Sequence, residues 1–181
     1  MLAVHALVIV QPVTDPAYPF EPKSTSYLRS GQFWGVALSD GRWACGRVLA
    51  AGEQTLPLLS GQSRRMFLAG LMNWAGDHPP TQDSIAGGDI VAQGLAHVRT
   101  IQENGGSVLG KRDLALDGIR GLQRVTHRAG GTVMIFEGAV PLRPATRDEA
   151  ATMPVLSTWG FKVISRLAER LFVQQLPLAS D

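Results

Sequence analysis

The chain has 181 residues, of which 45% are hydrophobic, and its 17 basic and 15 acidic residues give a formal net charge of +2. This length suits one domain that buries enough surface to fold without disulfides or metals. The single cysteine, Cys45, excludes an internal disulfide framework and any metal site built from several cysteines, and its place in a strand suggests a small buried hydrophobe. A charge this small does not by itself indicate a nucleic-acid partner.

The first thirty residues predict an extended strand followed by a proline-rich connector. Residues 1–10 are apolar but too short to span a bilayer, and they lack the basic start and cleavage site of a signal peptide, so we interpret them as a strand or a leader. Residues 11–30 hold four prolines, which is typical of an extended surface segment. Residues 31–181 then form a single mainly β domain with a C-terminal helix. We expect no membrane segment and a cytoplasmic protein.

Residues 33–50 predict a β-hairpin at the centre of the sheet. Asp40-Gly41 lies between two apolar runs, and an Asp-Gly pair favours a two-residue type I′ turn because glycine accepts positive φ freely. This turn pairs Trp34 with Arg47 and places both side chains on one face. Since neither face of the hairpin is polar, we expect it to be covered on both sides.

Trp34, Arg47 and Trp74 are the residues that we expect to line a partner-binding surface. In the predicted register the Arg47 guanidinium stacks on the Trp34 indole. The alternative for Arg47 is a structural role, with its stem packed over apolar neighbours at a barrel edge. Packing is the default role for all four tryptophans, and any that is exposed becomes a candidate anchor because Trp and Arg dominate interface energetics.

The run of residues 31–49, GQFWGVALSDGRWACGRVL, resembles the opening hairpin of the immunity protein 26 family. Members of this family share a glycine, then an apolar run and a leucine. A turn of Asp-Gly-Arg followed by an aromatic residue comes next, and the hairpin ends in Gly-Arg-Val. The residues that carry the resemblance are Gly31, Phe33, Leu38, Asp40, Gly41, Arg42, Trp43, Gly46, Arg47 and Val48. The resemblance implies a mainly β domain, encoded beside a polymorphic toxin, that neutralises the toxin by binding it.

Further strands are expected in the middle of the chain. Residues 64–74 are apolar throughout, so periodicity does not separate a buried strand from a helix, but the aromatic content and flanking turns favour a strand. Residues 95–102 alternate and predict a strand, 107–109 a short returning strand, and 132–142 a strand that ends or bulges near its glycine and proline.

The C-terminal part carries the clearest helical pattern, over about residues 158–171. Its apolar side chains recur at spacings of three and four: Phe161, Ile164, Leu167, Ala168 and Leu171. We expect this amphipathic helix to cover the β domain, or alternatively to bind a partner. Before it, Thr146 and the acidic residues that follow predict one capped helical turn.

The sequence contains no motif typical of a catalyst or of a cofactor or metal site. The four histidines (His5, His78, His97 and His127) lie far apart in the sequence. Residues 111–128 hold five basic and two acidic residues, which we interpret as a solvated loop; the alternative, a phosphate-binding patch, lacks an aromatic residue to stack bases. We therefore expect neither an enzyme nor a cofactor.

These features predict a mainly β (α+β) fold, with a twisted antiparallel sheet or small barrel around the central hairpin. The expected function is that of an immunity-type protein, whose partner is a cognate bacterial toxin domain rather than nucleic acid or a membrane. The alternative is a small β-barrel that binds a small molecule or RNA under the hairpin.

Overall fold

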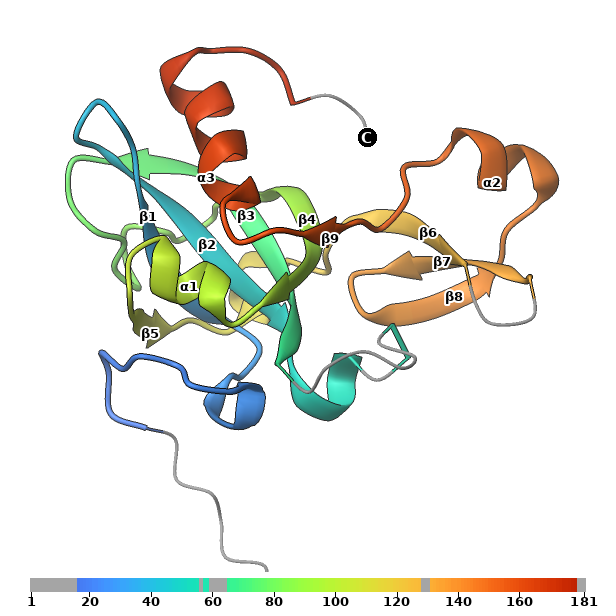
Figure 1. Cartoon of the computed structure of the whole chain (residues 1–181), viewed down its shortest axis with the longest axis horizontal. Coiled ribbons are helices and arrows are strands. Elements are labelled where there is room, and N and C mark those ends of the chain that lie inside the picture. The colour runs from blue at the N-terminus through green and yellow to red at the C-terminus, as the bar shows by residue number, and fades with distance from the viewer. Residues whose placement is uncertain (1–15, 56, 59–64, 128–130, 179–181) are drawn as a thin grey trace, which may run out of the picture.

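The computed structural model describes residues 16–55, 57–58, 65–127 and 131–178. In these residues nine strands form two sheets, one with the strand order β5-β1-β2-β3-β4-β9 and one with the order β6-β7-β8 (Figure 1). The mainly β prediction is confirmed. The larger sheet is open rather than closed into a barrel, so the barrel alternative is wrong. The predictions for residues 1–10 lie outside the described residues.

The larger sheet is antiparallel except where β9 runs parallel to β4. Its strands are β1 (Gln32–Ala37), β2 (Trp43–Ala50), β3 (Met66–Gly76), β4 (Ile90–His97), β5 (Val108–Lys111) and β9 (Thr158–Trp159). The antiparallel smaller sheet contains β6 (Gln123–His127), β7 (Val133–Glu137) and β8 (Val140–Pro144). The helices are α1 (Arg99–Glu103), α2 (Arg147–Thr152) and α3 (Val163–Ala168), with 3₁₀ turns at Thr25–Tyr27, Gly52–Thr55 and Leu114–Asp117.

The hairpin of β1 and β2 lies inside the larger sheet, as predicted, but its register is shifted by one residue. The Gly41 N–H donates to the Leu38 carbonyl at 3.1 Å, and Gly41 has a φ of +89°. The turn is therefore a longer loop that ends in a left-handed glycine, not a two-residue type I′ turn. As a result Trp34 pairs with Gly46, and Arg47 lies on the opposite face of the sheet. The predicted stacking of Arg47 on Trp34 is wrong.

Both faces of the larger sheet are covered, as the apolar hairpin predicts. The first face, which carries Trp34, Phe67 and Trp159, packs against buried residues of α1 and α3 (Figure 1). The second face, which carries Phe33 and Cys45, packs against the smaller sheet and neighbouring turns. Residues 33–50 therefore form the centre of a three-layered core.

Two glycines in strand interiors let indole rings lie directly on the sheet. A Cβ atom at Gly46 would collide with the Trp34 indole, and one at Gly94 would collide with the Trp159 indole. Trp34 also makes an edge-to-face contact with Phe67, at 5.9 Å between ring centroids. Glycine weakens a strand by itself, but here it admits a large aromatic side chain to the core.

Several strands and helices begin or end at other residues than predicted, because tertiary pairing outweighs the local sequence pattern. The predicted strand of residues 64–74 is confirmed as β3. The predicted strand 95–102 is in fact the end of β4 followed by α1. The C-terminal helix begins at Val163, not at residue 158, because Thr158–Trp159 pairs with β4; a π-helical turn, Glu169–Val173, then continues it.

The outer strands of the sheets are protected in different ways. Phe20 pairs with Val108 through two backbone hydrogen bonds of 3.1 and 2.8 Å, so the N-terminal connector covers the edge at β5. The edge strand β8 contains Pro141 and Pro144, which have no N–H to offer a further strand. No helix in the described part of the chain is long and apolar enough to cross a membrane.

Candidate binding site

The structure does not bring the three predicted partner-binding residues together at the surface. Trp34 and Arg47 are fully buried, on opposite faces of the larger sheet. Trp74 is half-buried and packs against the cluster on the second face. In this conformation Trp34 and Arg47 are core residues. A role of the three in partner binding stays a prediction.

Arg47 lies in a buried polar junction on the second face. Its Nη2 donates to the Arg112 carbonyl at 2.6 Å and its Nη1 contacts the Met72 sulfur at 3.7 Å, while Nε has no hydrogen-bond partner among the described residues. Burial lowers the pKa of the Arg47 guanidinium. Its interior position disagrees with the barrel-edge role considered above.

Asp117 supplies the negative charge of this junction. Its carboxylate, which is 1% exposed, accepts two hydrogen bonds of 2.8 Å from the Arg112 guanidinium and one of 2.9 Å from the Gly87 N–H. The hydrogen bonds from Arg112 chiefly lower the pKa of Asp117. The segment 111–128 is therefore not simply a solvated loop, since Arg112 is ion-paired and Gln123–His127 forms β6. The hydrogen bonds of this junction connect β2 with the segments around Gly87 and Arg112.

Cys45 is fully buried, and burial raises the pKa of its thiol to about 12. A thiol with this pKa remains protonated at neutral pH and is a poor nucleophile. The interpretation of Cys45 as a small buried hydrophobe is confirmed.

A fork between the two sheets forms the candidate site. Strand β9 pairs with β4 only at Leu95 and Ala96, where the Leu95 N–H donates to the Ser157 carbonyl at 2.9 Å. Just before Ser157 the chain instead pairs with β6 through two hydrogen bonds around Val125, of 3.0 and 2.9 Å. Residues 154–157 thus pass from the edge of the smaller sheet, at β6, to the edge of the larger sheet, at β4. A gap lies between this segment and the preceding part of β4. We call this gap the fork.

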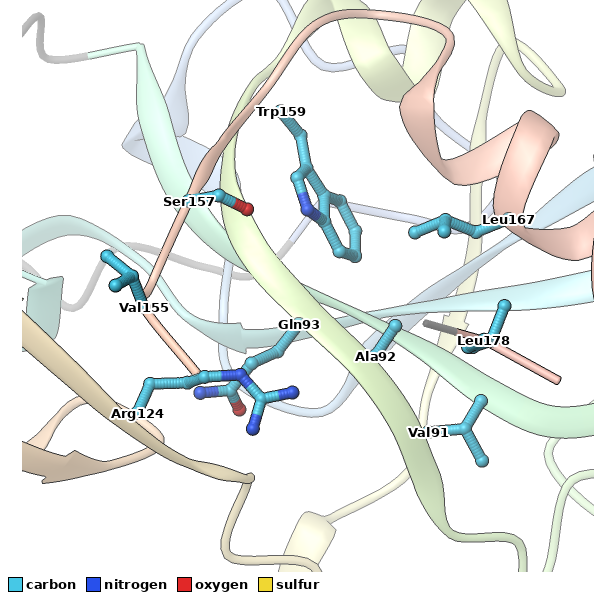
Figure 2. Close-up of a pocket in the computed structure, with 9 residues that line it drawn as sticks. All are labelled: Val91, Ala92, Gln93, Arg124, Val155, Ser157, Trp159, Leu167 and Leu178. Carbon is cyan, nitrogen blue, oxygen red and sulfur yellow. The ribbon is translucent and has the colours of Figure 1, made fainter. Parts of the chain in front are cut away.

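A small pocket occupies the fork (Figure 2). Its volume is about 50 Å³. The residues that line it come from β4, β6, β9 with the segment before it, α3 and the C-terminal segment: Val91, Ala92, Gln93, Arg124, Val155, Ser157, Trp159, Leu167 and Leu178. Arg124 reaches toward the pocket from β6, while Trp159 and Leu167 approach from the opposite side (Figure 2).

Polar groups of β4 define the floor of the fork. The Gln93 side chain pairs with the backbone of Leu122, accepting from its N–H at 2.6 Å and donating to its carbonyl at 2.8 Å. Along an antiparallel strand, alternate residues direct their backbone groups to the same side. Because Leu95 directs its N–H to Ser157, the N–H and carbonyl of Gln93 also point into the fork.

Sequence reasoning missed this site because no motif marks it. The lining residues come from five separate segments and are mostly ordinary apolar side chains. They come together because residues 154–157 pair with both sheets. These pairings join residues that are far apart in the sequence, and no local sequence pattern indicates them. The basic character of the segment that contains Arg124 was the single available signal.

The fork can hold a side chain or a few water molecules. A pocket of about 50 Å³ is far smaller than the roughly 300–1,000 Å³ typical of sites for drug-sized ligands. Within the described residues, no three His, Cys, Asp or Glu side chains are grouped so that they could hold a metal ion. The groups that line the fork are apolar side chains, one guanidinium, one hydroxyl and the buried Gln93.

The fold and the site together define a mainly β protein with an open six-stranded sheet and a small pocket at its edge. Comparison of the chain with protein-family models, with curated proteins and with solved structures finds no match.

Proposed function

We propose that this chain is a cytoplasmic immunity-type protein that binds a cognate bacterial toxin domain and neutralises it. The observation that carries the proposal is the resemblance of residues 31–49 to the hairpin of the immunity protein 26 family. This stretch forms the two inner strands β1 and β2 of a mainly β protein, a setting compatible with the fold that the resemblance implies.

The motif residues at the hairpin tip support a scaffold role for this stretch. The Asp40 carboxylate accepts hydrogen bonds from the Arg42 N–H at 3.0 Å and from its Nε at 2.8 Å. Arg42 Nη2 in turn donates to the Phe172 carbonyl at 2.8 Å, and Ser39 donates to the Glu169 carboxylate. The DGR turn thus ties the C-terminal helical segment to the sheet.

Several large apolar side chains are exposed and are available for contacts with a protein partner. Among the described residues, those that are large, apolar and close to half exposed or more are Tyr27, Leu116, Val140, Leu142, Val155 and Leu176. Such side chains are candidates for contacts with another protein. The volume of the fork does not favour a drug-sized molecule at that place, and Arg112, one of the basic residues of the segment 111–128, is ion-paired within the chain.

Co-expression with a toxin-like domain encoded by the neighbouring gene tests the proposal. We expect the chain to restore growth of cells that express this domain and to co-purify with it as a stable complex. An unrelated toxin domain serves as the control and should not be neutralised. Continued growth arrest together with the absence of a complex would contradict the immunity function.

A further inference from the structure

We propose that the outer face of the C-terminal helical segment is the surface on which the toxin domain docks, and that the toxin domain meets it with acidic side chains. This face carries Lys162, Arg166 and Arg170, which together we call the basic stripe. The inference rests on the proposed function, because it assigns the surface that the toxin domain would contact.

The basic stripe lies on the side of the helix that faces away from the sheet. Ile164 and Ala168 are fully buried in the cluster on the first face of the larger sheet. Each residue of the stripe is two positions from one of them, which corresponds to about 200° around a helix. The three stripe residues are accordingly exposed, and Figure 1 shows α3 at the outside of the molecule.

The charges of the stripe have no counter-charge within the described part of the chain. Other arginines form ion pairs with carboxylates, namely Arg42, Arg99, Arg112 and Arg143. By contrast, no side chain of the stripe makes a hydrogen bond or an ion pair with another described residue. Residues 161–178 contain one acidic residue, Glu169, and its carboxylate instead accepts hydrogen bonds of 2.6 and 2.8 Å from Ser39. The stripe is therefore a positive surface that is available to a partner.

Helix stability does not explain this arrangement of charges. Like charges four residues apart on a helix repel one another, and both steps of the stripe have this spacing. A cation near the C-terminal end, such as Arg170, is favoured by the helix dipole, but Lys162 lies at the N-terminal end, where the dipole opposes a cation. An acidic surface bound to the stripe would relieve both repulsions.

An exposed leucine beside the stripe favours a protein as the source of the acidic groups. Leu176 is 49% exposed, and its N–H donates to the Arg170 carbonyl at 2.9 Å. Protein interfaces combine apolar contacts with a polar rim, whereas single-stranded nucleic acids stack their bases on available aromatic rings. The aromatic rings of this segment are engaged within the chain, because Phe161 contacts Arg99 and Phe172 packs against the first-face cluster.

The hairpin tip fixes the orientation of the stripe. Ser39 binds Glu169, and Arg42 donates to the Phe172 carbonyl at 2.8 Å, so these contacts lie on both sides of Arg170 in the sequence. A surface that is ordered before association loses less conformational entropy when it binds. The DGR turn thus supports the surface that we assign to the toxin domain.

The kinetics of binding between the full chain and the purified toxin domain test the inference. We expect K162E/R166E/R170E to associate about tenfold or more slowly than the unmodified chain at low salt, because complementary charges accelerate association. K23E/R120E/R147E is the matched control, since it changes the net charge equally at exposed positions outside the helix. This control should associate faster than K162E/R166E/R170E.

The salt dependence of association gives a second readout. Raising the ionic strength from about 0.01 to about 0.1 M shortens the screening length from about 30 to about 10 Å. We expect this change to slow association of the unmodified chain and to affect K162E/R166E/R170E less. Association that does not depend on salt would overturn the inference.

A milder variant, K162Q/R166Q/R170Q, removes the charges without reversing them. Glutamine and glutamate are both good helix formers, so we expect circular dichroism and urea midpoints close to those of the unmodified chain. If the glutamate variant does not fold, the glutamine variant decides, and its association should also be slower than that of the control.

Neutralisation of the toxin domain separates this inference from the proposed function. If the stripe variants bind and neutralise the toxin domain as well as K23E/R120E/R147E does, docking on the stripe is overturned, although the immunity function stands. If the unmodified chain neither binds nor neutralises the toxin domain, the immunity function is overturned and the inference with it. Loss of binding to random-sequence duplex DNA or to anionic lipid vesicles in the stripe variants, with binding of the toxin domain unchanged, would also overturn a protein as the occupant.

Discussion

At the scale of single residues, the junction of Arg47, Arg112 and Asp117 concentrates charge in the interior. The Asp117 carboxylate, which is 1% exposed, forms an ion pair with Arg112, and its charge also favours the charged form of the buried Arg47, which donates to the Arg112 carbonyl. Burial of an ion pair contributes little net stability compared with apolar packing, but loss of one partner leaves an uncompensated buried charge. Asp117 is therefore the member of this junction whose removal costs most.

We expect D117N to lower the free energy of unfolding strongly at neutral pH, because Arg47 and Arg112 lose their counter-charge. Urea denaturation measures the effect. E103Q is the control: Glu103 forms an exposed ion pair with Arg99, whose side chains are 29% and 55% exposed, and surface pairs contribute on the order of 0–1 kcal/mol. Equal destabilisation by D117N and E103Q would contradict the structural role of the junction.

We also expect the effect of D117N on the free energy of unfolding to depend on pH. Arg112 lowers the pKa of Asp117 in the folded state, so the carboxylate contributes stability above its unfolded-state pKa of about 3.9, and this contribution is lost as the pH falls through the folded-state pKa. The difference in unfolding free energy between the unmodified chain and D117N should be constant near neutral pH and shrink below about pH 4. A difference that does not change with pH would argue that Asp117 acts through packing alone.

At the scale of elements, local pattern predicts where strands lie better than how they pair. Apolar content and turn residues are sufficient to place the central hairpin and β3. The pairing register of β1 and β2 depends on the length of the Leu38–Gly41 turn. A turn that is longer by one residue moves Arg47 and its neighbours to the opposite face of the sheet. An Asp-Gly pair is compatible both with a two-residue type I′ turn and with the longer loop that the structure shows. The sequence pattern favoured the type I′ turn, which is wrong.

The C-terminal boundary differs from prediction for a related reason. Helical periodicity extends back to about residue 158, but Trp159 gains more from lying on Gly94 and pairing with β4 than from a further helical turn. No local signal connects positions 94 and 159. The candidate site, which depends on this contact, was therefore beyond the reach of sequence analysis.

We expect G94A to detach β9 from β4, because the added methyl group would overlap the Trp159 indole. Overpacking of this kind costs roughly 1–3 kcal/mol. The measurements are the unfolding free energy in urea and a red shift of tryptophan emission as the indole, 5% exposed, enters water.

G160A is the matched control for G94A. A Cβ atom at Gly160 would be 4.0 Å from its nearest neighbour, Val163, which leaves room for a methyl group. Equal stability and emission of G94A and the unmodified chain would contradict the close packing of Trp159 on β4.

At the scale of the whole molecule, the two sheets share one apolar cluster. Phe136 of β7 is fully buried among residues of the larger sheet's second face, and Gln93 binds the backbone just before β6. The four tryptophans all lie in strands of the larger sheet. Tryptophan fluorescence therefore reports on the larger sheet, and circular dichroism reports on both.

We expect F136A to destabilise both sheets together, by about 3–5 kcal/mol, the usual cost of removing a buried phenylalanine ring. The midpoints of urea unfolding by fluorescence and by circular dichroism should fall equally. L142A, in the neighbouring strand at a position 48% exposed, should change them little. A fluorescence midpoint that stays in place while the dichroism midpoint falls would show that the smaller sheet unfolds alone.

The parallel pairing of β9 with β4 also affects the order of events during synthesis. Strands β1 to β5 are complete once residue 111 has left the ribosome, but the indole that covers Gly94 arrives only with residue 159. Until then the nascent chain displays the whole edge of β4 and part of its core to other chains. In the interval between these two points of translation we expect the unpaired edge of β4 to favour aggregation.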